Sequence, residues 1–193
     1  MRIKEFKGSK TERNVLAAFA GESQARTRYS FFSSIARKEG YEQISAIFQE
    51  TSDNEKEHAK LFFQHLKSGT AQVDAAYPAG IIGTTAQNLQ AAAEGEKFEW
   101  GTLYPDFGKI AEEEGFKDVA YTFRMIAKVE AYHERRYLKL LENVNQGTVF
   151  KKEKPIKWKC RDCGYVHEGS EAPSMCPVCS HSRSYFEVWT EDY

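Results

Sequence analysis

Apolar side chains recur at intervals of three and four residues through most of the first 145 positions. This period is typical of helices that bury one face, because side chains at that spacing lie on the same side of a helix. The pattern predicts four long helices, over residues 9–38, 42–67, 86–114 and 117–145. Ser9 and Glu12 have the spacing of a capping box at the start of the first helix. Ser68-Gly69 is expected to end the second helix.

Residues 70–85 contain proline and glycine without a clear period, and we interpret them as a long crossover connection. Four helices joined in this way predict a mainly α protein, a four-helix bundle of the one-crossover type. After residue 147 comes a charged segment, 148–155, which we expect to be a linker, followed by a small unit rich in Cys, Gly and Pro. The expected domains are therefore a bundle over 1–147, and a linker with a small metal-binding unit over 148–193.

The two halves of the predicted bundle repeat each other after 75 residues. The shift aligns these pairs: Gly40 with Gly115, Phe48 with Phe123, Glu55 with Glu130, His58 with His133, and Tyr29 with Tyr104. Such a repeat predicts a pseudo-two-fold axis that gathers equivalent residues around one centre. Glu22 precedes Tyr29 by seven residues, whereas Glu96 precedes Tyr104 by eight. One extra residue within a helix predicts a π-bulge beside Glu99.

The residues expected near that centre are acidic and imidazole side chains on apolar helix faces. They are Glu22, Glu55, His58, Glu96, Glu99, Glu130 and His133. A single Glu-x-x-His motif on a helix is usually a solvated pair, but here it occurs twice, at equivalent positions. Five carboxylates in one core repel each other and carry a large desolvation cost, which two divalent cations would offset. One Glu from each of two helices plus Glu-x-x-His from each of two others is the pattern of di-iron and di-manganese proteins. Oxygen and imidazole ligands leave iron and manganese both open.

All four cysteines lie in the last third of the chain, in two CxxC pairs, Cys160/Cys163 and Cys176/Cys179. This clustering predicts one tetrahedral site with four thiolate ligands, which suits zinc or a single iron ion. Taken alone, a structural zinc site is the favoured interpretation. A redox metal centre elsewhere in the chain needs electrons, however, and a mononuclear iron-thiolate site supplies them one at a time. We therefore expect iron.

The bulk composition adds two negative expectations. With 41% hydrophobic and 28% charged residues and a net charge of -1, the chain gives no electrostatic reason to expect nucleic acid as a partner. It has no apolar run near the roughly 20 residues that span a bilayer, and its first residues lack the apolar core of a signal peptide. We expect a cytoplasmic protein without a membrane partner.

From about Thr11 to Trp189 the sequence resembles the rubrerythrin family. The matching motifs are Glu22-Ser-Gln-Ala, Glu55-Lys-Glu-His58, Glu96-Lys-Phe-Glu99, Tyr104-Pro105, Glu130-Ala-Tyr-His133, Trp158-Lys-Cys-Arg-Asp-Cys-Gly-Tyr and Cys176-Pro-Val-Cys179. The resemblance implies a ferritin-like bundle whose di-iron ligands are the seven Glu and His residues named above. It also implies a rubredoxin-like domain with one iron ion on the four cysteines. Ser180 stands where stand-alone rubredoxins have glycine.

The resemblance implies a cytoplasmic peroxidase that reduces hydrogen peroxide to water in oxidative-stress defence. Electrons would come from NAD(P)H through a separate reductase or a rubredoxin. A head-to-tail homodimer would bring one chain's cysteine site near the other's di-iron site. One iron would exchange Glu99 for His58 on reduction. Tyr29 and Tyr104 are expected either to pack as core aromatics or to hydrogen-bond metal ligands.

Two other functions stay open at this point. A ferroxidase or iron-handling protein shares the same carboxylate scheme, and a bundle with a zinc ribbon could simply bind a partner. The fifth carboxylate, Glu99, and the appended cysteine unit favour the peroxidase, because a protein that only oxidises iron for storage needs no electron relay of its own.

Overall fold

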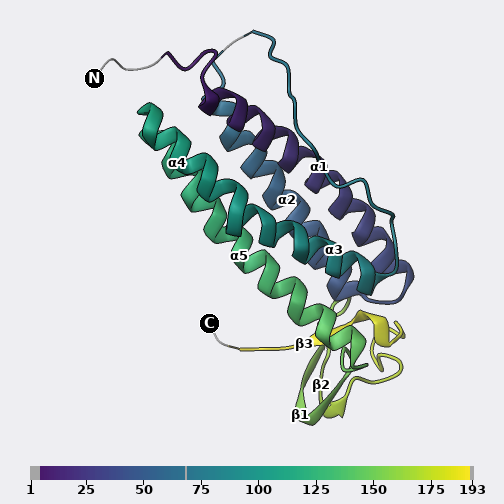
Figure 1. Cartoon of the computed structure of the whole chain (residues 1–193). Coiled ribbons are helices and arrows are strands. Elements are labelled where there is room, and N and C mark those ends of the chain that lie inside the picture. Colours follow the sequence, from purple (N-terminus) through teal and green to yellow (C-terminus); the bar gives the residue numbers. More distant parts are fainter. Residues whose placement is uncertain (1–4, 68, 192–193) are drawn as a thin grey trace.

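The computed structural model describes residues 5–67 and 69–191. Its larger part is a bundle of long helices that lie side by side (Figure 1). The helices are α1 (Lys10–Lys38), α2 (Glu42–His65), α3 (Thr85–Phe98), the π-helix η1 (Glu99–Leu103), α4 (Tyr104–Glu114) and α5 (Lys117–Asn145). The four predicted helices are thus present, and the third is divided by the π-helix. The expectation of a mainly helical, ferritin-like bundle is confirmed.

The helix ends follow local chemistry, with two differences from the predictions. Ser9 Oγ accepts the Glu12 backbone N–H at 2.9 Å, but the Glu12 carboxylate bonds the backbone N–H of Gly8, at 2.6 Å, so only half of the capping box forms. Helix α2 ends at His65, and Leu66 is extended. Ser68, on which part of the predicted helix stop fell, lies outside the described residues.

The connection from α2 to α3 has no helix or strand in its described part, and it runs along the outside of α1 (Figure 1). Tyr77 anchors it, because its hydroxyl donates a hydrogen bond to the Ala17 carbonyl at 2.8 Å. The Tyr77 ring lies over Gly21, where the Cβ of any larger residue would be only 3.5 Å from the ring. The crossover expected from the sequence is therefore present and covers one face of α1.

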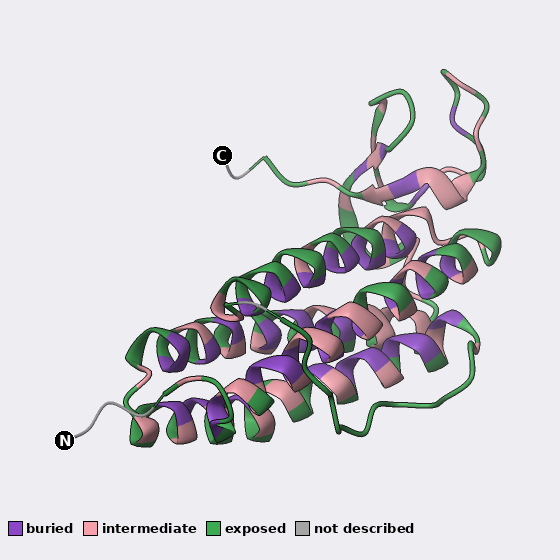
Figure 2. Cartoon of the chain, turned by 90° about the horizontal axis from the view of Figure 1, so that it is seen from above, coloured by how far each residue is buried: buried purple, intermediate pink, exposed green. Residues whose placement is uncertain are grey.

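Two apolar clusters lie along the inside of the bundle, on the buried faces coloured purple in Figure 2. One contains Phe32, Phe48 and Leu89, and the other contains Phe62 and Phe123. Each fully buried side chain of this size stabilises the fold by about 1.5–3 kcal/mol. These clusters hold the helices firmly on both sides of a buried polar layer, which is described below.

The C-terminal part is a three-stranded antiparallel sheet of order β2-β1-β3. Its strands are β1 (Lys151–Cys160), β2 (Val166–Glu171) and β3 (Phe186–Val188). The expectation of a linker over 148–155 is wrong from Lys151 onward. There the charged side chains belong to a strand, and Lys151 forms an ion pair with Glu171 at 2.9 Å. Trp158 is fully buried in this small core.

The small sheet packs at the end of the bundle where α1 meets α2. The rings of Tyr41 and Phe150 are stacked there, with centroids 6.1 Å apart. Gly40 lies against Ser184, and its φ of 84° is a conformation that glycine adopts at no steric cost. Within the described residues, no helix is long and apolar enough to cross a membrane.

Candidate metal centres

Two carboxylates at the centre of the bundle each face both histidines. Glu55 lies 2.7 Å from His58 Nδ1 through one oxygen and 3.2 Å from His133 Nδ1 through the other. Glu130 repeats this arrangement, at 2.9 Å from His58 and 2.7 Å from His133. The two imidazole rings are 6.0 Å apart between centroids. The pseudo-two-fold repeat therefore produces a pair of carboxylates that can bridge two metal ions, with one histidine for each.

One further glutamate completes the donor set on each side. Glu22 joins Glu55, His58 and Glu130 in one group of potential ligands, and Glu96 joins Glu55, Glu130 and His133 in the other. Within each group the candidate ligand atoms all lie within 4.8 Å of one another. Helices α1, α2, α3 and α5 each contribute, which is the distribution of donors found in ferritin-like di-metal proteins.

Glu99, the fifth carboxylate, belongs to neither group. It is the first residue of the π-helix, and it comes three residues after Glu96. The Tyr104 backbone N–H bonds the Glu99 carbonyl, which closes the wider turn. The π-helix thus absorbs the one-residue difference between the two halves, as the sequence predicts. It places Glu99 beside the centre, held by a backbone turn different from that of the other donors.

Two buried tyrosines form hydrogen bonds with Glu22 and Glu96, the glutamates that each belong to a single donor group. Each of these bonds joins one half of the 75-residue repeat to the other. Tyr29 of α1 donates to Glu96 of α3 at 2.6 Å, and Tyr104 of α4 donates to Glu22 of α1. Burial and nearby carboxylates raise the pKa of both tyrosines well above the usual value, so the phenols keep their protons as donors. Both roles considered for these tyrosines are present, because each ring packs in an apolar cluster and each phenol bonds a candidate ligand.

The electrostatics of the centre are those of crowded, desolvated anions. Burial, reinforced by neighbouring carboxylates, raises the pKa values of Glu22, Glu96 and Glu99 well above the usual range. Burial would also raise the pKa of Glu130, but His133 and His58 outweigh it and lower that pKa to about 2. Carboxyl groups so crowded and buried are neutralised by protons or by bound cations, and two divalent cations would hold them in the ionised form.

The positions of the candidate ligand atoms suit metal coordination better than hydrogen bonding among the side chains. Glu22 Oε2, Glu96 Oε2 and both oxygens of Glu130 are buried and accept no hydrogen bond. The two Glu130 oxygens lie 2.9 Å and 2.7 Å from the Nδ1 atoms of His58 and His133 but lack the alignment of a hydrogen bond, and Glu22 Oε2 is 4.0 Å from His58 Nδ1. Buried polar atoms without partners are rare in folded proteins. Converging carboxylate oxygens and imidazole nitrogens are the ligands that iron prefers in such sites.

The four cysteines form a second centre in the small sheet domain. None forms a disulfide. Cys160 Sγ lies 3.7 Å from Cys179 Sγ, and Cys163 Sγ lies 3.5 Å from Cys176 Sγ. A tetrahedral ion with sulfur ligands at ~2.3 Å needs sulfur atoms ~3.8 Å apart, so the observed spacing fits one ion. Backbone N–H groups of Tyr165 and His181 bond to Cys163 and Cys179.

Ser180 follows the second CxxC pair with a φ of 61°, a left-handed conformation that is unfavourable for a residue with a side chain. It is the only residue other than glycine with positive φ in the part of the chain that the structure describes. The turn that glycine would form is therefore retained, and the four sulfur atoms still converge. His181 Nδ1 lies 3.4 Å from Cys179 Sγ, outside the set of four thiolates.

Comparison with known proteins assigns the chain to a family. Residues 13–141 match the family model "Rubrerythrin", and residues 158–187 match "Rubrerythrin, rubredoxin-like domain". The chain belongs to the rubrerythrin family. It is 58% identical to a rubrerythrin of Porphyromonas gingivalis over 190 residues, which is 98% of this chain and 95% of that one. It is 51% identical to a rubrerythrin of Nitratidesulfovibrio vulgaris, covering 96% of this chain and 97% of the relative.

A solved structure of nigerythrin in a partially reduced state is also similar, with a TM-score of 0.62 and 29% identity, over 98% of this chain and 94% of that one. Proteins of the rubrerythrin family are oxidoreductases. Membership also carries the family's iron cofactors, to which the two donor clusters correspond: a di-iron site in the bundle and one iron ion on the four cysteines.

Sequence reasoning missed several residues around the candidate di-iron centre. Trp100 donates its indole N–H to Glu134 at 2.7 Å and thereby joins the π-helix to α5. The positive charge of Arg28 lies close enough to Glu99 to oppose the rise in its pKa. Tyr137, one turn after His133, packs against Tyr29. The 75-residue repeat pairs Tyr137 with Phe62. Only Tyr137 carries a hydroxyl, and this difference between the halves was the sequence signal that could have pointed to it.

Proposed function

We propose that this chain is a non-haem di-iron peroxidase that reduces hydrogen peroxide to water in cytoplasmic oxidative-stress defence. The reaction takes up two electrons and two protons for each peroxide and yields two water molecules. The proposed di-iron ligands are Glu22, Glu55, His58, Glu96, Glu99, Glu130 and His133. The observation that carries the proposal is the position of Glu99, beside the centre but outside both donor groups.

The charge balance explains how Glu99 would act. Two ferrous ions carry a charge of +4 and two ferric ions +6, whereas five ionised glutamates contribute -5. The reduced centre therefore has one carboxylate more than neutrality requires, and the oxidised centre can use all five. Anionic oxygen favours the more highly charged ion, whereas neutral imidazole suits the less charged one. His58 already lies within one donor group, as a ferrous arrangement requires. We infer that Glu99 is a ligand of the oxidised centre and His58 of the reduced one.

When bound, the two irons supply one electron each for cleavage of the oxygen–oxygen bond. The protein residues control position and protons. Tyr29 and Tyr104 fix the orientation of Glu96 and Glu22 through their hydrogen bonds. Glu99, whose pKa is raised by burial and by Glu96, would hold a proton in the reduced centre and could give it to a product oxygen.

Electrons would enter through the rubredoxin-like domain. Within one chain that domain packs near Tyr41, about 14 residues from Glu55 along α2, which is roughly 20 Å of helix. A head-to-tail homodimer would shorten the route by placing the partner's cysteine site beside this bundle. The donor to the cysteine site would be a rubredoxin or an NAD(P)H-dependent reductase. Nigerythrin has been solved in mixed-valent and fully reduced, all-ferrous states, which supports redox-active iron in the family.

A ferroxidase is the alternative. It is favoured by the two donor groups taken alone, which resemble those of ferritin-like iron oxidases. Glu99 separates the two functions. We expect Glu99→Gln to retain bundle iron, because Glu99 lies outside both donor groups, and to lose most of its NAD(P)H-linked peroxide consumption. Glu113→Gln, an exposed change on α4, is the matched control and should behave as the wild type.

Crystal structures of the reduced and oxidised protein give the second test. We expect one iron to be bound by Glu99 when ferric and by His58 when ferrous. Identical ligands in both states would contradict the exchange. If Glu99→Gln kept full peroxide turnover, the peroxidase assignment would lose the observation on which it rests.

A further inference from the structure

A cavity of about 540 Å³ lies beside the proposed di-iron centre, between α1, the crossover connection and the π-helix. Glu99 and Tyr104 form part of its wall. Tyr104 is also the hydrogen-bond donor to Glu22, so one residue both bonds a proposed metal ligand and belongs to the cavity wall. The cavity therefore reaches the side of the centre on which Glu99 lies.

The hollow is built by small residues of α1 under a fixed cover. Ala17, Ala18 and Gly21 line it from the helix. Residues 74–78 of the crossover line it from the outside, and Tyr77 holds them through its bond to the Ala17 carbonyl. Leu103 and Phe107 make the opposite wall apolar. A larger side chain at Ala17 would occupy the space that the cover encloses.

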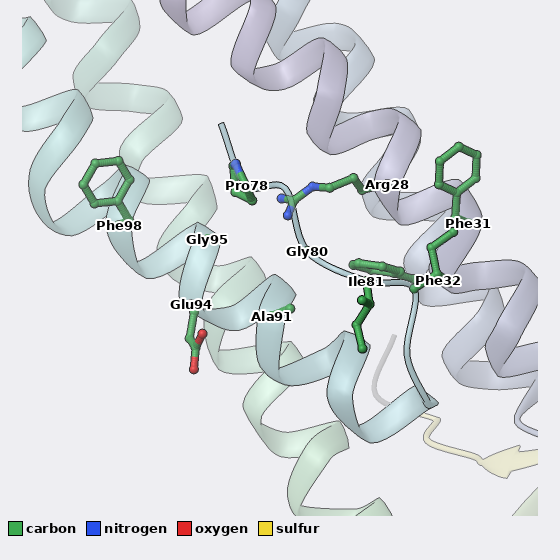
Figure 3. Close-up of a pocket in the computed structure, with 11 residues that line it drawn as sticks. Arg28, Phe31, Phe32, Pro78, Gly80, Ile81, Ala91, Glu94, Gly95 and Phe98 are labelled. Carbon is green, nitrogen blue, oxygen red and sulfur yellow. The ribbon is translucent and has the colours of Figure 1, made fainter. Parts of the chain in front are cut away.

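Two hydrogen-bond donors among the lining residues have no partner. Asn14 Nδ2 and Arg28 Nε are both buried without a hydrogen bond. Leaving such a donor unpaired costs about 1–3 kcal/mol, so a ligand that accepts hydrogen bonds would gain affinity by drawing these two side chains toward the cavity. Figure 3, a close-up of the adjoining cavity, shows the Arg28 side chain extending from α1 toward Pro78 and Gly80 of the crossover. Arg28 thus lies at the junction of the two spaces.

The size of the cavity indicates the class of ligand. A water molecule occupies about 30 Å³, and hydrogen peroxide is larger by only one oxygen atom, so it would fill a small fraction of the space. Cavities of about 300–1,000 Å³ typically hold small organic molecules, with apolar walls and a few polar groups that orient them. The wall contains two carboxylates, Asp74 and Glu99, and two guanidinium groups, Arg13 and Arg28, so its charges balance and select neither an anion nor a cation. A neutral molecule with an apolar body and an acceptor oxygen fits these walls.

We propose that this cavity binds small organic hydroperoxides, with the peroxide group at Glu99 and the hydrocarbon part among Ala17, Gly21 and Phe107. The inference rests on the proposed peroxidase function and extends its substrate class. In the reaction the oxygen–oxygen bond breaks, and two electrons from the two ferrous ions and two protons convert the hydroperoxide to an alcohol and water. Asn14 and Arg28 would turn their unpaired donors toward the cavity and orient the oxygen atoms.

The test compares two leucine substitutions on α1 in the full-length, iron-loaded protein. Ala17→Leu fills the cavity, whereas Ala20→Leu makes the same change three residues away, outside the lining. Binding of cumyl alcohol, the product from cumene hydroperoxide, is measured by equilibrium dialysis. We expect Ala17→Leu to weaken this binding about tenfold or more, the usual scale of overpacking, and Ala20→Leu to leave it unchanged. Iron content should match the wild type in both.

Turnover gives the second readout. Ala17→Leu should lower kcat/KM for cumene hydroperoxide about tenfold or more, and that for hydrogen peroxide much less, because the smaller substrate needs less of the cavity. The inference would be overturned if cumyl alcohol did not bind, or if the wild type and Ala17→Leu bound it equally. The proposed function would still stand in that case, provided that the protein reduced hydrogen peroxide. Reduction of hydrogen peroxide but not of cumene hydroperoxide would overturn the hydroperoxide assignment alone, and reduction of neither would overturn the proposed function as well.

Discussion

Removing one phenol oxygen tests whether the crossed tyrosine bonds support the metal centre. In Tyr29→Phe the ring keeps its packing against Phe48 and Tyr137, but the bond to Glu96 at 2.6 Å is lost. Both partners are buried, and the other Glu96 oxygen already accepts no hydrogen bond. A buried hydrogen bond to a charged group contributes about 1.5–3 kcal/mol. At about 1.4 kcal/mol for each factor of ten, this predicts a loss of about ten- to one-hundredfold in metal affinity, the usual effect of removing a partner of a metal ligand.

The assay is an anaerobic competition for ferrous iron between the protein and a chromophoric chelator. We expect the site that contains Glu96 and His133 to weaken in Tyr29→Phe, and the site that contains Glu22 to weaken in Tyr104→Phe. Tyr41→Phe is the control, because it removes the same atom from a half-buried ring that lies outside the bundle centre. Tyr29→Phe affinities equal to those of Tyr41→Phe would refute the reasoning.

Three further predictions follow from the same geometry. Glu130→Gln should lose at least one bundle iron, because both Glu130 oxygens face the two metal positions; full iron content by metal analysis would exclude Glu130 as a bridge. A chain ending at residue 147 should keep its bundle iron but lose donor-linked turnover, and full turnover would show that the cysteine site is no relay. In metal-free protein, carboxylates outweigh burial and raise the pKa of His58 from 6.5 to about 10 and that of His133 to about 12. The stability from these protons is complete below pH 6.5 and is lost as pH rises through about 10 for His58 and about 12 for His133, so the metal-free Tm should fall as pH rises from 6.5; a rising Tm would contradict the assignment.

The donor set could be predicted because helices impose a fixed geometry on sequence spacing. Glu and His three residues apart must share a helix face, and the 75-residue repeat brings two such pairs together. The one-residue difference between the halves likewise predicts the π-helix, because a helix has few ways to absorb an insertion. These features needed no knowledge of tertiary contacts.

Features that depend on tertiary contacts could not be predicted. The repeat indicates that Tyr29 and Tyr104 are equivalent, but not that each bonds the glutamate of the opposite half. The start of β1 is charged because Lys151 pairs with Glu171 across the sheet, and along the chain this composition has the pattern of a linker. The cavity depends on a crossover without periodicity, and no local signal marks residues that line a space.

The most direct test of the peroxidase assignment is the reoxidation of the fully reduced, iron-loaded protein in a stopped-flow spectrometer. The protein is mixed with equal concentrations of hydrogen peroxide or dioxygen, and formation of the ferric bundle site is followed by its absorption. We predict that hydrogen peroxide oxidises the diferrous site much faster than dioxygen does. Faster oxidation by dioxygen would contradict the peroxidase assignment and favour the ferroxidase.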